Sequence, residues 1–346
     1  ILKMKKLTFI DLFAGIGGFH IAMHRNGVEC VFASEWDKFA RQTYESNFRD
    51  ISPSLFQKGN FAGDINKVEL SSIPDFDILC GGFPCQPFSI AGLKRGFEDT
   101  RGTLFFRIAQ IVKNKCDNQY PPKVLLLENV KGLLHHDKGR TLDTICDVLD
   151  DLGYNVRYKV LNAKNFGVPQ NRERLFIVAW RKSSNVANFC FPIGLYSDKS
   201  PVFEGEESSK TLLTTKVGDI LLDEVDSKYT LSERLYAGHL RRKEEHKKKG
   251  NGFGFSLFNS ESPYTSTISA RYYKDGSEIL IEQKGDRPRK LHPIEAARLQ
   301  GFPIGDKFRI VVSDTQAYKQ FGNSVAVPVV TTLSQEIIKQ LINLAI

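Results

Sequence analysis

The sequence predicts an α/β fold, in which a mixed, mostly parallel sheet carries helices on both faces and is followed by a smaller, mostly β/loop domain. Two observations lead to this prediction. Over residues 7–180, short apolar runs alternate with amphipathic segments of helical length, which indicates parallel strands joined by helices. Over residues 183–290 that alternation stops and Ser, Gly, Lys and Glu become frequent, as is typical of short strands and long loops.

The elements of the first part follow from its hydrophobic periodicity. Four apolar runs are predicted strands, at residues 7–13, 30–35, 77–81 and 123–130. Four amphipathic segments are predicted helices, at residues 20–26, 38–47, 104–115 and 141–152. Gly27 and Gly153 follow two of these helices, where we expect them to act as C-terminal caps. Residues 154–163 and 175–180 are two further strands with only a polar loop between them, which predicts an antiparallel pair at the sheet edge.

The composition limits the class of protein. The 346 residues are 41% hydrophobic and 25% charged, as in a soluble globular protein with an ample core. No apolar stretch approaches the roughly 20 residues that cross a bilayer. Residues 1–10 resemble the start of a signal peptide, but Asp11 interrupts the apolar run, so we expect no secretion. The net charge of +8 points weakly to a polyanionic partner.

The six cysteines are scattered, with no Cys-x-x-Cys pair. This spacing argues against a metal site and against a disulfide framework, and it favours a reducing, cytoplasmic location. Residues 241–249 form a charge run that we interpret as a solvated helix face, with direct contact to a polyanion as the alternative. We expect domains at residues 1–185 and 186–290, with residues 291–346 returning to the first.

The most informative segment is residues 81–89, Gly-Gly-Phe-Pro-Cys-Gln-Pro-Phe-Ser, which follows an apolar strand. The glycines permit close approach and Pro84 fixes the direction of the chain. Cys85 is thereby presented at the end of a strand, as a nucleophile is. The alternative is an inert core cysteine.

A glycine-rich turn follows the first strand, in the sequence Phe-Ala-Gly-Ile-Gly-Gly at residues 13–18. Such a turn lets a ligand approach backbone amides at a helix N-terminus. Glu35 and Trp36 end the second strand, where a carboxylate can bind ribose hydroxyls and an indole can stack on adenine. Asp64 can supply a further contact to the base. A tight turn without a ligand is the alternative for each feature, but their order suggests a nucleoside cofactor.

Charged residues also end the strands of the second half of the sheet. Glu128 ends the strand at residues 123–130, where desolvation would raise its pKa and make it a plausible proton donor. Arg172 and Arg174 precede the last strand and offer guanidinium donors to a ligand oxygen. The alternative for the arginines is a surface ion-pair cluster.

Five motifs occur in the order found in the cytosine-C5 DNA methyltransferases, which the chain therefore resembles from residue 9 to 330. They are Phe-Ala-Gly-Ile-Gly-Gly (13–18), Pro-Cys-Gln (84–86), Glu-Asn-Val (128–130), Gln-Asn-Arg-Glu-Arg (170–174) and Gln-Phe-Gly-Asn-Ser-Val (320–325). The resemblance implies a Rossmann-like catalytic domain that uses S-adenosylmethionine and yields S-adenosylhomocysteine. It also implies a target-recognition domain inserted before the last motif.

The resemblance also implies roles for individual residues. Cys85 would attack C6 of a flipped-out cytosine, while Glu128 would contact N3 and the exocyclic amine. Arg172 would hold O2, and Arg174 would support the pocket and the carboxylate. The implied cofactor-binding positions are Phe13, Gly15, Ile16, Gly17, Glu35, Trp36, Asp64, Ile65, Pro84, Leu104, Asn323 and Ser324.

Contacts to double-stranded DNA are implied for two segments. Residues 86–101 match the family's mobile loop that closes over the flipped base, and Gln86, Ser89 and Arg101 are its candidates for DNA contact. Residues 250–255 and 267–276 are similar to the recognition segment of Dcm-type enzymes, which act within CC-containing sites such as CCWGG. There Thr267, Arg271 and Lys274 are the candidates. Arg271 and Lys274 either donate to guanine in the major groove or touch only phosphates.

We expect a monomeric bacterial or phage modification enzyme that needs no bound endonuclease. Two alternatives of the same fold are an RNA (tRNA) cytosine methyltransferase and a catalytically silent DNA-binding homologue. A nicotinamide-dependent dehydrogenase is disfavoured because the glycine spacing is not Gly-x-Gly-x-x-Gly.

Overall fold

The computed structural model describes residues 6–84, 104–184, 186, 189–250, 254–305 and 307–343. The chain forms two compact units. The first comprises Ile1–Leu161, Glu173–Pro192 and Val330–Ile346, and the second comprises Asn162–Arg172 and Ile193–Val329. Residues 162–172 and 193–329 thus form one compact unit, and the division into domains at residues 1–185, 186–290 and 291–346 stays a prediction.

A seven-stranded sheet with the order β3-β2-β1-β4-β5-β7-β6 forms the centre of the first unit. Its strands are β1 (Thr8–Leu12), β2 (Glu29–Ser34), β3 (Phe61–Ala62), β4 (Ile78–Gly82), β5 (Val124–Val130), β6 (Tyr154–Asn162) and β7 (Glu173–Arg181). The pairs from β3 to β5 are parallel, and β7 runs antiparallel to β5. The mixed sheet with β6 and β7 as neighbours at one edge is as predicted, whereas β3 is too short to give a periodic signal.

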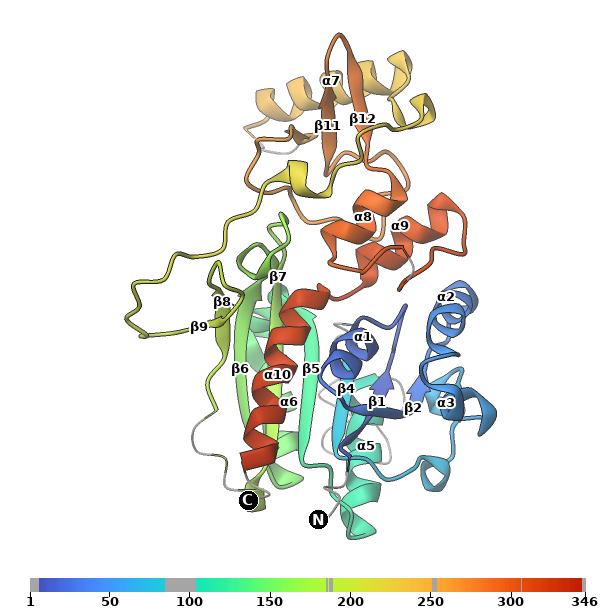
Figure 1. The fold of residues 1–346 in the computed structure, drawn as a ribbon, viewed down its shortest axis with the longest axis vertical. Helices are drawn as coiled ribbons and strands as arrows, with labels where there is room; N and C mark the ends of the chain where they lie inside the picture. Colours follow the sequence, from blue (N-terminus) through green and yellow to red (C-terminus); the bar gives the residue numbers. More distant parts are fainter. Residues whose placement is uncertain are drawn as a thin grey trace. The chain divides into compact units, whose positions relative to one another are not determined.

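Helices cover both faces of this sheet. They are α1 (Gly18–Arg25), α2 (Lys38–Phe48), α3 (Pro53–Gln57), α5 (Leu104–Asp117), α6 (Arg140–Asp151) and α10 (Val327–Asn343). Figure 1 shows α1 and α10 in front of the sheet and α5 and α6 behind it. Gly27 and Gly153 follow α1 and α6 with φ of 79° and 88°, so they adopt the left-handed conformation expected after a helix end.

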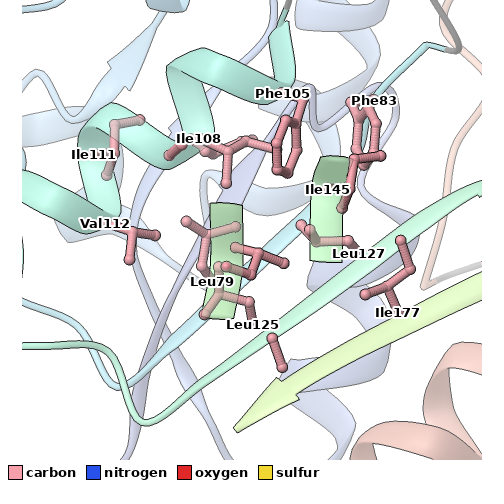
Figure 2. Close-up of a cluster of buried hydrophobic side chains, with 14 of the residues drawn as sticks. Leu79, Phe83, Phe105, Ile108, Ile111, Val112, Leu125, Leu127, Ile145 and Ile177 are labelled. Carbon is pink, nitrogen blue, oxygen red and sulfur yellow. The ribbon is translucent and has the colours of Figure 1, made fainter. Parts of the chain in front are cut away.

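The core behind the sheet joins α5 and α6 to the central strands. Figure 2 shows Phe105, Ile108 and Val112 of α5 directed at Leu79 and other strand residues. All of these side chains are buried, and each contributes roughly 1.5–3 kcal/mol of hydrophobic stabilisation relative to exposure. This packing makes the sheet a rigid base for the loops at its edge.

Where the structure describes it, the second unit contains short strands and long loops, as expected, together with helices. Its strands are β8 (Pro192–Leu195), β9 (Pro201–Phe203), β10 (Leu257–Phe258), β11 (Leu280–Gln283) and β12 (Asp286–Lys290), and its helices are α7 (Glu233–Lys248), α8 (Pro293–Leu299) and α9 (Asp314–Asn323). The predicted charge run lies on α7 and its side chains are mostly exposed. In the parts of the chain that the structure describes, no helix is both long and apolar enough to span a membrane.

Candidate active site

The carboxyl ends of the parallel strands meet at one edge of the sheet, and the predicted cofactor residues of the first unit follow them. After β1 the chain turns sharply, with positive φ at Phe13 (56°), Gly15 (55°) and Gly17 (86°). A Cβ atom at Gly17 would lie 2.1 Å from the ring of Phe48. Only glycine satisfies both demands at position 17, because it tolerates positive φ and leaves room for the ring. Ile16 is buried within this turn.

Glu35 connects the end of β2 to this glycine turn. Its Oε2 atom accepts a hydrogen bond from the Gly15 amide at 2.8 Å, and Oε1 accepts one from the Asp37 amide at 2.8 Å. The side chain is mostly buried, and burial raises its pKa, although the amide hydrogen bonds act in the opposite direction. Each carboxylate oxygen keeps a second lone pair, so the group can still accept hydrogen bonds from a ligand.

The remaining cofactor positions of the first unit lie at the ends of neighbouring elements. The indole of Trp36 is 83% exposed, which is unusual for so large an aromatic side chain. Asp64 follows β3 and accepts a hydrogen bond from the Asn66 amide at 3.0 Å, while Ile65 is buried. Pro84 is exposed after β4, and Leu104 begins α5. A glycine turn, a carboxylate and an exposed indole at one sheet edge suit an adenosine-containing ligand.

Glu128 and Arg174 form an ion pair between two antiparallel strands. Arg174 Nε lies 3.2 Å from Glu128 Oε1. Burial lowers the pKa of the Arg174 guanidinium, and the charge of Glu128 partly offsets that effect. The other carboxylate oxygen, Oε2, would lie 3.4 Å from a Cβ atom at Gly82. The pair therefore lies beside Gly82, the last residue of β4. Gly82 precedes Cys85 by three residues in the sequence.

Asn129, for which no role was predicted, connects β5 to the segment that follows β4. Its Nδ2 donates to the Phe83 carbonyl at 2.8 Å, and its Oδ1 accepts from the Val130 amide at 2.8 Å. The side chain is buried, so these hydrogen bonds hold the chain just before Pro84 in place. The sequence contains one signal for this role, because Asn129 is a polar residue beside Glu128 in an otherwise apolar strand.

Arg172 lies in the second unit, and its guanidinium binds backbone carbonyls there. Its Nη1 donates to Ile268 O at 3.1 Å, and its Nη2 donates to Ser324 O at 2.7 Å and Gly322 O at 3.1 Å. It is 3% exposed. The predicted cofactor residues Asn323 and Ser324 lie at the end of α9 in the same unit.

The predicted recognition residues lie on a turn anchored by Tyr272. That buried side chain donates to Ile279 O at 2.6 Å and accepts from the Leu291 amide at 2.8 Å. Arg271 and Lys274, on either side of it, are exposed, as a contact to bases or phosphates would require. Thr267 Oγ1 donates to Asn171 O at 2.6 Å, which fixes the start of the segment.

Four predicted residues lie outside the part of the chain that the structure describes: Cys85, Gln86, Ser89 and Arg101. Residues 251–253 of the first recognition segment lie outside it as well. Among the residues that are described, no cluster of His, Cys, Asp and Glu side chains could hold a metal ion.

The chain is similar to known proteins over nearly its whole length. The family model of C-5 cytosine-specific DNA methylases matches residues 7–339. The Type II methyltransferase M.SsoII of Shigella sonnei is 55% identical over 97% of this chain and 81% of its own length. The Type II methyltransferase M1.ScrFI of Lactococcus lactis subsp. cremoris is 53% identical over 98% of this chain and 80% of its own length.

Among solved structures, the S. pombe Dnmt2 methyltransferase matches with a TM-score of 0.70 and 20% identity, over 97% of this chain and 99% of that one. This likeness confirms the predicted methyltransferase fold. The family match spans both units and includes every motif quoted above. The chain belongs to the C-5 cytosine-specific DNA methylase family and is a DNA (cytosine-5-)-methyltransferase.

Proposed function

We propose that this enzyme transfers a methyl group from S-adenosylmethionine to C5 of a cytosine flipped out of a specific duplex DNA site, as a modification methyltransferase. The observation that carries the proposal is the ion pair of Glu128 and Arg174 beside Gly82. It puts a carboxylate and a guanidinium, the two groups that can bind the polar edge of cytosine, beside Gly82, which precedes Cys85 by three residues in the sequence. The relatives named as Type II methyltransferases support the modification role.

The residues of the first unit fit S-adenosylmethionine. Glu35 offers acceptor lone pairs for ribose hydroxyls, and the exposed Trp36 offers a face for adenine. Asp64 lies at the end of the neighbouring strand β3, where it can accept a hydrogen bond from the base. When bound, S-adenosylmethionine supplies an electrophilic methyl group. We further propose that Asn323 and Ser324 contact it from the end of α9.

Cys85 is the proposed nucleophile. Its thiolate adds to C6 of the cytosine, and the electron pair of the C5–C6 bond shifts toward N3, which makes C5 nucleophilic. Glu128, in its protonated form, donates to N3 and accepts from the exocyclic amine, so it stabilises the adduct. After C5 has been methylated, a base removes its proton and the C6–S bond breaks, which restores the ring and the thiolate.

Contact to O2 of the cytosine is better assigned to Arg174 than to Arg172. The resemblance led us to place Arg172 there, but its Nη atoms donate to three backbone carbonyls in the second unit. Arg174 uses Nε for Glu128 and Nη1 for the Glu173 carbonyl. A guanidinium has five N–H groups, so Arg174 retains donors for O2.

The proposed substrate is duplex DNA with a CC-containing site, such as CCWGG, CCNGG or CCGG. The exposed Arg271 and Lys274 can donate to guanine or to phosphates, and Thr267 lies next to them in the chain. Gln86, Ser89 and Arg101 are proposed to contact the DNA around the flipped base. A monomeric enzyme in the cytoplasm, with no bound endonuclease, is the simplest arrangement, because the two strands can be methylated in separate events.

A mechanism-based trap tests the proposal. Bisulfite sequencing of DNA treated with the enzyme first identifies the methylated site, and tRNA serves as the competing substrate. A duplex with 5-fluorocytosine at that site, together with S-adenosylmethionine, should then give a conjugate that survives denaturation and maps to Cys85. Cys85→Ser should give no conjugate and still bind the duplex. A fully active enzyme without a conjugate would overturn the nucleophile, and preferential methylation of tRNA would overturn the substrate.

A further inference from the structure

Arg172 joins two segments of the second unit that are far apart in the sequence. Nη1 binds the carbonyl of Ile268, 96 residues away, and Nη2 binds the carbonyls of Gly322 and Ser324, 150 and 152 residues away. The first segment is the proposed DNA-recognition segment. The second carries Asn323 and Ser324, the pair that we propose to contact the cofactor.

On the cofactor side, Arg172 caps the C-terminus of α9. The last carbonyls of a helix lack partners within the helix and carry partial negative charge. The Arg172 guanidinium binds two of the carbonyls at this end, and Gln300 Nε2 binds a third, that of Phe321, at 2.6 Å. Both side chains are buried, so the cation is shielded from solvent at the helix end, where its charge is most effective.

On the DNA side, the recognition segment is held by the residues just before Arg172. Thr265 N donates to Pro169 O at 2.8 Å, and Asn171 N donates to Thr265 O at 2.9 Å. Ile268 N donates to the side chain of Gln170 at 3.0 Å. The segment therefore pairs with residues 169–171 like a short strand, and Arg172 continues that pairing into α9.

A second contact joins the same two segments without Arg172. A Cβ atom at Gly322 would lie 2.3 Å from the carbonyl carbon of Ser269. The backbone of the recognition segment therefore packs directly against α9 at Gly322. A side chain at position 322 would prevent this close approach. A shift of one segment must move the other, because both the hydrogen bonds and this contact are rigid.

We propose that Arg172 is a positioning residue that couples binding of the target DNA to binding of the cofactor. This inference rests on the proposed function, since it assumes that the recognition segment reads DNA and that Asn323 and Ser324 contact the cofactor. DNA that fixes the recognition segment also fixes the end of α9. The cofactor then binds to Asn323 and Ser324 in positions that are already set. The effect is reciprocal, so the cofactor strengthens DNA binding by the same factor.

Binding measurements on the full chain test the coupling. The probes are S-adenosylhomocysteine and the duplex that bisulfite sequencing identifies. In the wild type, the Kd of S-adenosylhomocysteine should fall about tenfold when the duplex is saturating, within the usual range for coupled sites. In Arg172→Ala and Arg172→Lys the change should fall below about threefold, because neither side chain can bridge three carbonyls. Arg298→Ala is the matched control, since Arg298 also donates to carbonyls of this unit, those of Ile220 and Leu221.

If Arg172 had only a structural role, its substitution would weaken the binding of each ligand measured alone. The factor by which the duplex lowers the Kd of S-adenosylhomocysteine would stay unchanged. Preserved coupling in Arg172→Lys therefore overturns the inference, as does a wild type without coupling. Should Arg172→Ala fail to fold, Arg172→Lys carries the test, with thermal unfolding as the check on folding. If the wild type methylates no duplex, the proposed function itself is wrong. If it methylates a duplex and the Arg172 variants keep the coupling between DNA and cofactor, only the role of Arg172 in that coupling is wrong.

Discussion

Arg174 Nε lies 3.2 Å from Glu128 Oε1, and the two side chains are only 20% and 13% exposed. Such a pair sets the orientation of both groups, because each would be left as a buried charge without the other. The register of β5 and β7 brings them together, with Val130 opposite Arg174. The pair is thus a product of the antiparallel edge of the sheet.

Removing either partner should slow methyl transfer. Glu128→Gln should lower the single-turnover rate about 10²- to 10⁴-fold, the usual contribution of a positioned acid, with little change in the Kd of S-adenosylhomocysteine. Arg174→Lys should also slow it, because an ammonium cannot bind Glu128 and O2 with the same geometry. Incorporation of a tritiated methyl group measures the rate. Glu173→Gln is the control, since Glu173, at the start of β7, forms an exposed pair with Lys131, just after β5; an equal loss there would contradict the assignment.

Asn129 should position the segment that leads to Cys85. Asn129→Asp keeps the acceptor for the Val130 amide but removes the donor to the Phe83 carbonyl. We expect the methylation rate to fall about 100-fold, as when a reacting group is misplaced by about 1 Å. The Kd of the duplex should change little. A wild-type rate in a folded Asn129→Asp protein would show that this hydrogen bond does not matter for the reaction.

Much of the fold was predictable because the sheet has a strong hydrophobic period. The contacts of Arg172 and Arg174 were not predictable, since the two residues lie in one motif and only the fold decides which groups each one meets. Arg174 lies on β7 opposite the end of β5, whereas Arg172 binds carbonyls 96 to 152 residues away. The charge run predicted a helix face where α7 lies, whereas the bounds of α8 and α9 could not be predicted, because these helices are only 7 and 10 residues long.

Trp36 should contribute directly to cofactor affinity. Stacking of a base on an aromatic side chain contributes about 1–3 kcal/mol, so Trp36→Ala should raise the Kd of S-adenosylhomocysteine about 5- to 150-fold. Trp36→Phe should raise it less. Isothermal titration calorimetry measures the Kd of each variant. The protein has two tryptophans, and Trp180 is buried, so quenching of Trp36 fluorescence in the wild type reports the stacking separately. Trp180→Phe, the matched change, should keep that quenching; its loss there would contradict the stacking.

Asp11 should make stability depend on pH. It is fully buried at the end of β1, and its pKa is raised well above the ordinary value by burial and by the charge of Glu35, while the His20 amide acts in the opposite direction. A raised pKa means that the folded state binds the proton more tightly than the unfolded state. The associated stability is therefore complete below about pH 4, the ordinary pKa of Asp, and is lost as the pH rises through the raised pKa.

Asp11→Asn removes this titration and keeps the shape of the side chain. Its free energy of unfolding relative to the wild type should therefore increase with pH, by about 1.4 kcal/mol for each unit of pKa difference, and then level off. Urea unfolding at a series of pH values measures it, and Asp147→Asn, on the exposed face of α6, is the control for removal of a carboxylate. A difference that is constant across pH would mean that Asp11 ionises as easily in the folded protein as in the unfolded chain. Burial without a compensating cation makes that outcome physically costly, which is why the experiment tests the environment of the residue directly.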